Sequence, residues 1–161
     1  MWFLEKRVKG TQGRNTKTKT PVMGFMERQG SVKAHVIENV TMRTIEKNIV
    51  NNVQFGSKLY TDDFLSYSRI GQVYDHESVK HGKSEYVRGE AHTNSMEGFW
   101  ANFKRGYYGT YHHMSKKHLQ KYVDEFVYRF NSRLEDFDLV FADMVKKVSV
   151  ADKLGYKKLT V

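Results

Sequence analysis

The first regular pattern along the chain is an alternation of apolar and polar residues between positions 20 and 39. Residues 20–28 and residues 31–39 are separated by Gln29-Gly30, and the second segment is apolar at every second position: Val32, Ala34 and Val36. A period of two is typical of half-buried strands, and a short connection containing glycine is typical of a hairpin. We therefore predict two antiparallel strands here.

From position 41 onward, apolar residues also recur with the 3.6-residue period of helices. Residues 41–53 place their apolar side chains within roughly 80° of the helix circumference, at Met42, Ile45, Ile49 and Val53. Residues 58–62 predict a short strand followed by a short helix through Tyr67, and residues 74–81 predict another strand.

The second half of the chain is predicted to be helical. One long helix spans about residues 93–107, and a second spans residues 115–133 with Ser115 as its N-cap. A last, short helix is predicted around residues 138–147. The buried stripe of the second helix consists of Leu119, Tyr122, Val123, Phe126 and Phe130. This order of strands and helices predicts a mixed α/β domain in which helices cover a sheet.

Composition changes this picture mainly through charge. The chain has 161 residues, 39% of them hydrophobic, which suits one domain with a real core. Its 27 basic and 18 acidic residues give a net charge of +9. This favours a nucleic-acid partner because neutralised phosphates release counterions, although charge alone also fits any basic protein. The absence of cysteine and of an apolar run near ~20 residues predicts a cytoplasmic protein without a membrane span.

Residues 92–106 (HTNSMEGFWANFKRG) contain the most informative pattern for chemistry. On a helix, Asn94, Glu97, Ala101 and Lys104 share one face, and Met96, Phe99, Phe103 and Tyr107 share the opposite one. The apolar face is expected to be core. The other face shows a carboxylate and a lysine two turns apart, which is either an ordinary solvated face or part of a site.

Asp62 and Asp63 follow the short strand predicted over residues 58–62. A carboxylate at a strand's carboxyl end is well placed to hold a metal ion, whereas the alternative is that it caps the next helix. Together with Glu97, such an acid predicts a Mg²⁺ site for phosphodiester cleavage or strand transfer, with Lys104 holding the phosphate.

Six of the seven histidines lie between His76 and His118, and several tyrosines follow Lys104. The histidine spacings fit no compact zinc pattern, so zinc is not expected. The cluster after Lys104 can either stack on unpaired bases or pack as the aromatics of a tight turn: Tyr107, Tyr108, Tyr111, His112 and His113.

The segments TDDFLSY, YDHESVKH and EYVRGEAHTNSMEGFWANFKRGYYGTYHHMSKKHLQKYVDEFVYRFNSR follow one another in this order. The chain resembles, over residues 20–133, the ISXO-type group of insertion-sequence DDE transposases. That family's pattern is an aspartate after a strand, a His-Thr-Asn-x-x-Glu-x-Phe-Trp block, a lysine, Gly-x-Tyr-His, and a helix ending in Phe-Asn-x-Arg. The resemblance implies an RNase H-like (retroviral-integrase-like) mixed sheet flanked by helices.

Transferred by position, the resemblance assigns catalytic roles to Asp62, Glu97 and Lys104, with Asn94 and His92 as further candidates. Asp62 and Glu97 are the expected ligands of Mg²⁺ or Mn²⁺. The expected DNA-binding residues are basic or aromatic: Lys6, Arg7, Lys9, Arg14, Lys17, Lys19, Lys104, Arg105, Tyr108, Tyr111 and His112. The implied partners are transposon ends and target DNA, while self-association into a homo-oligomer stays open.

The chain departs from the family pattern at its start. The family's first aspartate lies on an opening strand in a Val-Asp-Glu-Thr-Tyr type segment, but here Glu5 is the only acid before the basic stretch. We therefore expect a truncated copy that lacks the first strand and is inactive alone. Its parts would be a basic flexible segment (1–19), a partial catalytic domain (20–135) and a helical tail (136–161). The alternatives are a non-catalytic DNA-binding remnant and an unrelated basic nucleic-acid-binding domain.

Overall fold

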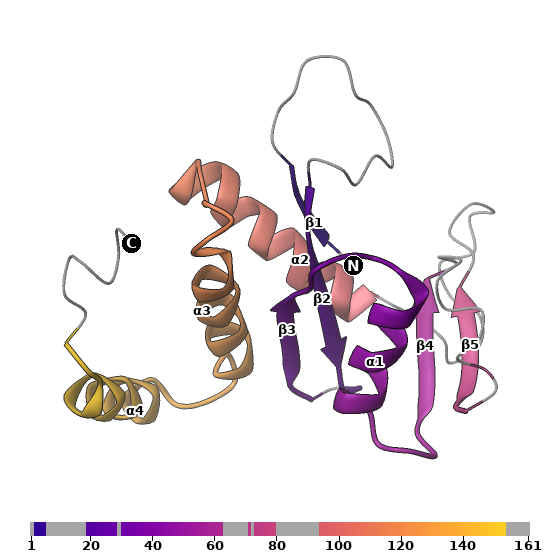
Figure 1. Cartoon of the computed structure of the whole chain (residues 1–161). Coiled ribbons are helices and arrows are strands. Elements are labelled where there is room, and N and C mark those ends of the chain that lie inside the picture. Colours follow the sequence, from indigo (N-terminus) through magenta and orange to yellow (C-terminus); the bar gives the residue numbers. More distant parts are fainter. Residues whose placement is uncertain are drawn as a thin grey trace.

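The computed structural model describes residues 2–5, 19–28, 30–62, 71, 73–79 and 94–153. Three antiparallel strands form the first sheet in the order β1-β2-β3: β1 (Trp2–Glu5), β2 (Lys19–Met26) and β3 (Val32–Val36) (Figure 1). The predicted hairpin is confirmed, with Val22 opposite Val36 and Met26 opposite Val32. The turn is closed by a hydrogen bond from the Gly30 amide to the Glu27 carbonyl (3.0 Å).

β1 corrects the expectation that the first strand is lacking. Its backbone pairs with β2 from Trp2 opposite Val22 to Glu5 opposite Lys19. Four residues give too short a pattern to be recognised locally, and their partner lies beyond the basic stretch, so only the long-range pairing identifies the strand. β2 is therefore the central strand of this sheet and not an unpaired edge. Within the segment 1–19, which was predicted to be flexible, residues 2–5 and Lys19 are in strands, and residues 6–18 lie outside the described residues.

β4 (Lys58–Asp62) and β5 (Asp75–Val79) form a second, parallel pair, with Asp62 opposite Val79. Both strands were predicted. The order of elements also predicted a single sheet, and we expected residues 58–62 to join the hairpin strands in it; this is wrong for the described residues, because β4 pairs with β5 in a separate two-stranded sheet. Hydrophobic periodicity identifies a strand without identifying its neighbour. The short helix predicted through Tyr67 lies outside the described residues.

The helix α1 (Met42–Asn52) connects the two sheets through a shared apolar cluster. Its buried residues Ile45 and Ile49 pack in one cluster with Met23 of β2, Ile37 and Tyr74, and Leu59 of β4 packs against the same cluster. Thr41 caps the helix, since its side chain accepts a hydrogen bond from the Thr44 amide (3.4 Å). Three members of the stripe predicted over residues 41–53 are confirmed in this cluster, Ile45, Ile49 and Val53, whereas Met42 is half-buried outside it.

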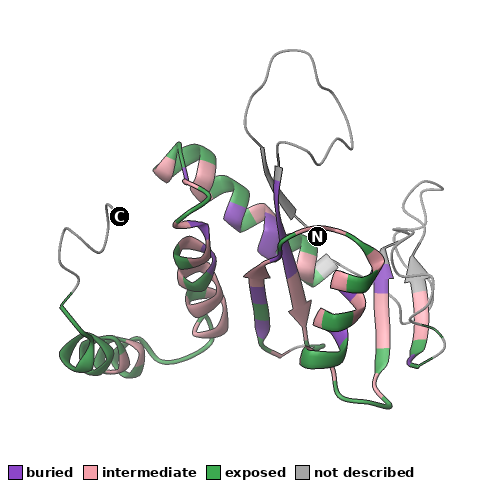
Figure 2. Cartoon of the chain, viewed as in Figure 1, coloured by how far each residue is buried: buried purple, intermediate pink, exposed green. Residues whose placement is uncertain are grey.

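The main core lies on the other face of the antiparallel sheet, where α2 (Asn94–Gly106) and α3 (Leu119–Asn131) cover it. Its buried members come from both strands and helices: Val22, Val32, Ala34, Phe99, Trp100, Phe103, Met114, Leu119 and Val123. Val22 and Met23 are adjacent in β2 but belong to the two different clusters, as successive side chains of a strand must. Helices thus cover both sheet faces, which confirms a mixed α/β class (Figure 2).

Two amide side chains of α3 hydrogen-bond to the free edge of β3. Asn131 accepts from the Val32 amide (2.8 Å) and donates to the Val32 carbonyl (3.0 Å). Gln120 accepts from the Val36 amide (2.7 Å) and donates to the Ala34 carbonyl (3.4 Å). An edge strand exposes unpaired backbone groups, so these amides both satisfy the edge and fix α3 against it.

α3 begins later than predicted, and Ser115 is not its N-cap. The residue before the helix is His118, and the Ser115 carbonyl accepts from the His118 amide (3.1 Å) in a preceding turn. The predicted apolar stripe of α3 is confirmed, because all five of its residues belong to the main core or pack against it.

α4 (Phe137–Val150) follows, and it is longer than the predicted residues 138–147. Asp136 caps it by accepting from the Asp138 amide (2.9 Å). No helix in the described part of the chain is both long and apolar enough to cross a membrane.

Candidate active site and DNA-binding surface

α2 separates its two faces as the sequence predicts. Phe99 and Phe103 are buried, whereas Glu97 in the first turn and Lys104 in the last turn are exposed. Trp100 was not in the predicted stripe, but it is also buried, in edge-to-face contact with Phe99 at 4.8 Å between ring centroids. Three aromatic side chains therefore fix the rotation of α2, and this presents Glu97 and Lys104 to solvent.

The carboxyl ends of the parallel strands β4 and β5 form the second part of the candidate site. Asp62 is the last residue of β4, and Thr61 before it is buried with its hydroxyl 2.8 Å from His76 Nε2 of β5. Lys58, the first residue of β4, forms an ion pair with Glu77 in the middle of β5 (2.7 Å). The backbone thus places Asp62 at a strand end where α/β sheets bind ligands.

Burial lowers the pKa of His76 below the ordinary value of 6.5. The imidazole is therefore neutral at pH 7 and can accept a hydrogen bond from the Thr61 hydroxyl. This pair fixes β4 and β5 to each other one residue before Asp62.

After α2 the backbone widens into a π-helical turn, η4 (Tyr107–Tyr111), which ends at His112 in the left-handed conformation (φ 54°). Such turns are rare in proteins as a whole, but where they occur they are often found at functional sites. Tyr111 donates a hydrogen bond to Glu125 of α3 (2.6 Å), and this bond is the main reason that its pKa is raised. Tyr107 and Tyr111 pack against the main core, whereas Tyr108 is exposed. Tyr107 and Tyr111 therefore fit the interpretation that these aromatic residues pack in a tight turn, whereas the exposed Tyr108 fits the interpretation that they stack on bases.

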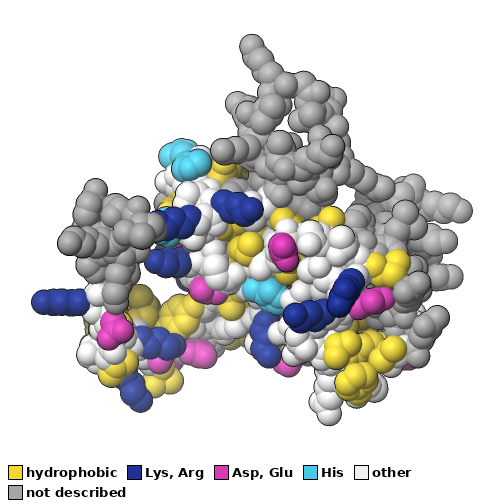
Figure 3. All heavy atoms as spheres, in the orientation of Figure 1, with side chains coloured by type: hydrophobic (Ala, Val, Ile, Leu, Met, Phe, Trp, Pro, Cys, Tyr) yellow, Lys and Arg dark blue, Asp and Glu magenta, His cyan; other side chains and the backbone are white. Residues whose placement is uncertain are grey.

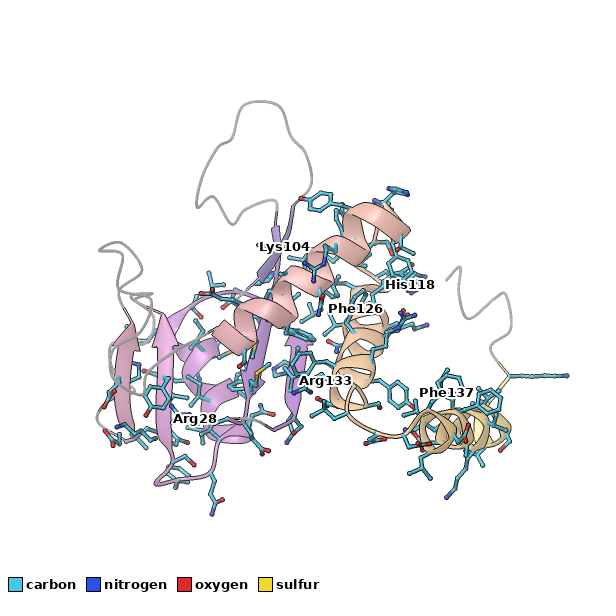
Figure 4. The ribbon with its side chains drawn as sticks, turned by 180° about the vertical axis from the view of Figure 1, so that it is seen from behind. Arg28, Lys104, His118, Phe126, Arg133 and Phe137 are labelled. Atoms are coloured by element: carbon cyan, nitrogen blue, oxygen red, sulfur yellow. The ribbon has the colours of Figure 1, made fainter. Side chains whose placement is uncertain are left out.

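Positive charge collects around η4, at the end of α2 and the beginning of α3. Figure 3 shows Lys, Arg and His side chains on this part of the surface, and Figure 4 locates Lys104 on α2 and His118 at the start of α3. The exposed members are basic or histidine: Lys104, Arg105, His112, His113, Lys116, Lys117 and Lys121. Arg105 also hydrogen-bonds to Asn102 of its own helix. Lys104, Arg105, Tyr108 and His112, all expected to bind DNA, lie together on this surface.

Several predicted site residues fall outside what the structure describes. His92 is one, and the basic residues Lys6, Arg7, Lys9, Arg14 and Lys17 are others. For Asp62, Asn94 and Lys19 the backbone is described but the side chain is not. Because the Asp62 side chain is not described, it stays a prediction that the Asp62 and Glu97 carboxylates lie within roughly 8 Å of each other, close enough to share metal ions. Among the described side chains, no group of three or more His, Asp or Glu could hold a metal ion.

The Phe-Asn-x-Arg motif at the end of α3 was noted in the sequence without a role. Asn131 is the residue that pairs with Val32 on the β3 edge. Arg133 lies over the Phe130 ring (3.9 Å from its centroid) and donates to the Phe130 carbonyl (2.6 Å). The motif therefore positions α3, and through it the α2–η4 surface.

Comparison with known proteins identifies a family for this chain. The family model described as ISXO2-like transposase domain matches residues 4–131, which includes part of β1 and all of α3. The chain is 31% identical over 125 residues to an uncharacterized protein in the transposable element ISH50 of Halobacterium salinarum, covering 74% of this chain and 42% of that protein. It is 28% identical over 98 residues to an uncharacterized transposase-like protein of Haemophilus influenzae, covering 60% of this chain and 78% of that protein.

The chain thus spans less than half the length of the first relative and most of the second. No solved structure matches significantly. Because the family model covers most of the described residues, from β1 through the β3 edge to the motif that ends α3, the chain belongs to the ISXO2-like transposase domain family.

Proposed function

We propose that this chain is the DNA-binding and strand-processing domain of a DDE-type transposase, with an RNase H-like arrangement of its elements. The order of three antiparallel strands, a helix, a parallel strand pair and further helices supports this arrangement. The proposed partners are the ends of the element and the target DNA.

The observation that carries the proposal is the exposed face of α2. Glu97 and Lys104 are seven residues apart, about 10 Å along the helix axis, and both are exposed on a helix whose rotation the core fixes. With this spacing, the Glu97 carboxylate can bind a metal ion while the Lys104 ammonium group binds a phosphate of the same DNA strand. The basic surface around η4 continues from Lys104, so this lysine lies next to side chains that can bind the DNA backbone.

We assign Asp62 and Glu97 as ligands of Mg²⁺ or Mn²⁺. Their carboxylate oxygens are the donor type that these ions prefer, and Asp62 stands at the carboxyl edge of β4. When bound, such an ion activates the attacking oxygen and stabilises the leaving oxygen at a phosphodiester. Lys104 would hold a neighbouring phosphate, and the basic surface around η4 would bind the duplex through its backbone. Asn94 and His92 remain secondary candidates beside Glu97.

We further propose that this chain alone binds DNA without cutting it. The aspartate that the family resemblance places on the first strand has no counterpart in β1, whose only acid is Glu5. Asp62 and Glu97 would then supply only two carboxylates, which would be a weak donor set for a pair of metal ions.

A nicking assay with DNA that contains the element's ends, and with Mg²⁺ or Mn²⁺, tests this proposal. We expect binding without product. Product that disappears on Asp62→Ala or Glu97→Ala would overturn the inactivity and would support the site, with Glu5 as its completing acid. Product that both variants retain would overturn the site itself. Asp138→Ala, which removes an exposed acid on α4, is the matched control.

A further inference from the structure

α4 exposes a long apolar stripe that nothing in the described part of the chain covers. At 100° per residue, five side chains fall within about 100° of its circumference: Phe137, Phe141, Met144, Val145 and Val148. All five are exposed, with Phe137 at 78% and Val148 at 74% of full exposure. Phe137 and Phe141 already stack on each other, with centroids 6.4 Å apart.

The contact between α4 and α3 uses a different side of the helix. Tyr128 of α3 donates to Asp143 (3.0 Å), and Lys147 lies over the Tyr128 ring (4.5 Å from its centroid). Asp143 and Lys147 lie outside the stripe, so α3 fixes α4 with its apolar stripe turned away. Figure 2 shows α4 exposed along nearly all of its length, and Figure 4 places Phe137 at its first turn, away from the core helices.

The spacing of the stripe is the one that pairs helices with each other. Phe137, Phe141, Met144 and Val148 follow one another at intervals of four, three and four residues. This is the alternation of a coiled-coil seam, in which each side chain inserts between residues of a facing helix. α4 also lies beyond residue 131, where the family match ends.

The charges of α4 indicate which helix fits and in which direction. Glu135, Asp136 and Asp138 are exposed at its beginning, and Lys146 is exposed near its end beside Lys147, which also pairs with Asp143 of the same helix. An identical helix in antiparallel orientation brings each acidic end beside a basic end, whereas a parallel one opposes like charges. The helix dipoles favour the antiparallel arrangement too.

The exposed area is sufficient for a small but specific interface. Taking ~150–250 Å² for a fully exposed large side chain, the stripe exposes roughly 500–600 Å² per copy. Two copies would bury about 1,000–1,200 Å², which reaches the lower limit for specific interfaces. Leu134, exposed just before the helix, adds to this area.

From these observations we propose that α4 is a self-association surface, on which a second copy of this chain packs antiparallel through its own α4. The pairing is two-fold symmetric, so Phe137 of one copy meets Val148 of the other, and Phe141 meets Met144. The two core domains then extend in opposite directions from a shared helix pair.

Sedimentation of the full chain between ~1 and 100 μM tests the surface. We expect a dimer of twice 18.9 kDa at the upper concentrations. The double substitution F141S/V148S should give a monomer with an unchanged circular dichroism spectrum. Leu139→Ser is the matched control, since Leu139 is equally apolar and exposed but lies on the other side of α4. A wild-type monomer at 100 μM, or a dimer that survives F141S/V148S, overturns the proposal.

Cysteine cross-linking tests the orientation, because the chain has no cysteine of its own. In an antiparallel pair the two copies of position 137 are about 16 Å apart, since eleven residues separate positions 137 and 148. A mixture of Phe137→Cys and Val148→Cys chains should therefore form a heterodisulfide, while each variant alone should cross-link at least tenfold less. Efficient cross-linking of Phe137→Cys with itself contradicts the antiparallel arrangement.

Discussion

Gly106, the last residue of α2, packs directly against Phe126 of α3. An ideal Cβ at this position would lie 2.2 Å from Phe126 Cζ, with Cε1 and Cε2 at 3.0 and 3.2 Å. Carbon atoms in contact prefer ~3.5–4.0 Å. The Phe126 ring cannot simply turn aside, because Phe103 packs edge-to-face against it (5.0 Å between centroids). In Gly106→Ala, therefore, the two helices must separate by about an ångström.

The size of the effect follows from two opposing contributions. Overpacking of this kind lowers the free energy of unfolding by about 1–3 kcal/mol. The backbone at Gly106 is helical (φ −61°, ψ −44°), so replacing glycine by alanine there also stabilises the helix by about 0.5–1 kcal/mol. We expect Gly106→Ala to lower the free energy of unfolding by about 1–2 kcal/mol in total. Gly98→Ala on the same helix meets no atom within 4 Å, so it should gain about 0.5–1 kcal/mol.

Urea unfolding followed by circular dichroism measures both variants. With a slope of about 2 kcal/mol per molar urea, Gly106→Ala should lower the midpoint by about 0.5–1 M and Gly98→Ala should raise it. Adding Phe126→Leu should reduce the cost of Gly106→Ala, because it removes the clashing ring. A midpoint for Gly106→Ala at or above the wild-type value would refute this account of the α2–α3 contact.

Three further predictions concern the β3 edge, pH and DNA. Asn131→Ala leaves the Val32 backbone groups without their side-chain partner, so it should lower the free energy of unfolding in urea by about 1–3 kcal/mol. Asn102→Ala, on the exposed face of α2, should change the free energy of unfolding by no more than about 0.5 kcal/mol. Equal effects of the two substitutions would contradict the edge contact. The lowered pKa of His76 contributes stability above pH 6.5 that is lost as the pH falls through the folded-state pKa. The melting temperature of the wild type should therefore fall more than that of His76→Gln between about pH 7.5 and about pH 5.5, and equal falls would contradict this. In DNA-binding titrations, the logarithm of the association constant should fall with the logarithm of the salt concentration, with a slope of about −0.9 per phosphate contact. Replacing the basic residues between positions 6 and 17 by glutamine should make this slope less steep. An affinity that does not change between ~50 and 200 mM salt would exclude binding through the DNA backbone.

Local patterns predicted most of the elements because their causes are local. The alternation at Val32 and Ala34 identified β3, and the 3.6-residue spacing of Ile45 and Ile49 identified α1. The amphipathic pattern of α2 likewise identified which face is core and left Glu97 and Lys104 outside it. These features follow from residues that are close together in the sequence.

The parts that sequence reasoning missed depend on distant partners. β1 is a strand because β2 pairs with it, and β4 lies outside the first sheet because β5 takes its hydrogen bonds. Ser115 has the right residue type for an N-cap, but its carbonyl instead closes a turn ahead of α3. The roles of Gln120 and Asn131 at the β3 edge become visible only when α3 is placed against the sheet.

The proposal that Asp62 and Glu97 share one metal site is tested most directly by Mn²⁺ binding, followed by electron paramagnetic resonance. If both carboxylates hold the same ion, Asp62→Asn and Glu97→Gln should each weaken binding by about tenfold or more, and the double variant should lose little further, because coupled ligands are not additive. Asp138→Asn should leave the affinity unchanged. Single substitutions that each match the Asp138→Asn control, or losses that add independently in the double variant, would show that Asp62 and Glu97 do not form a common site.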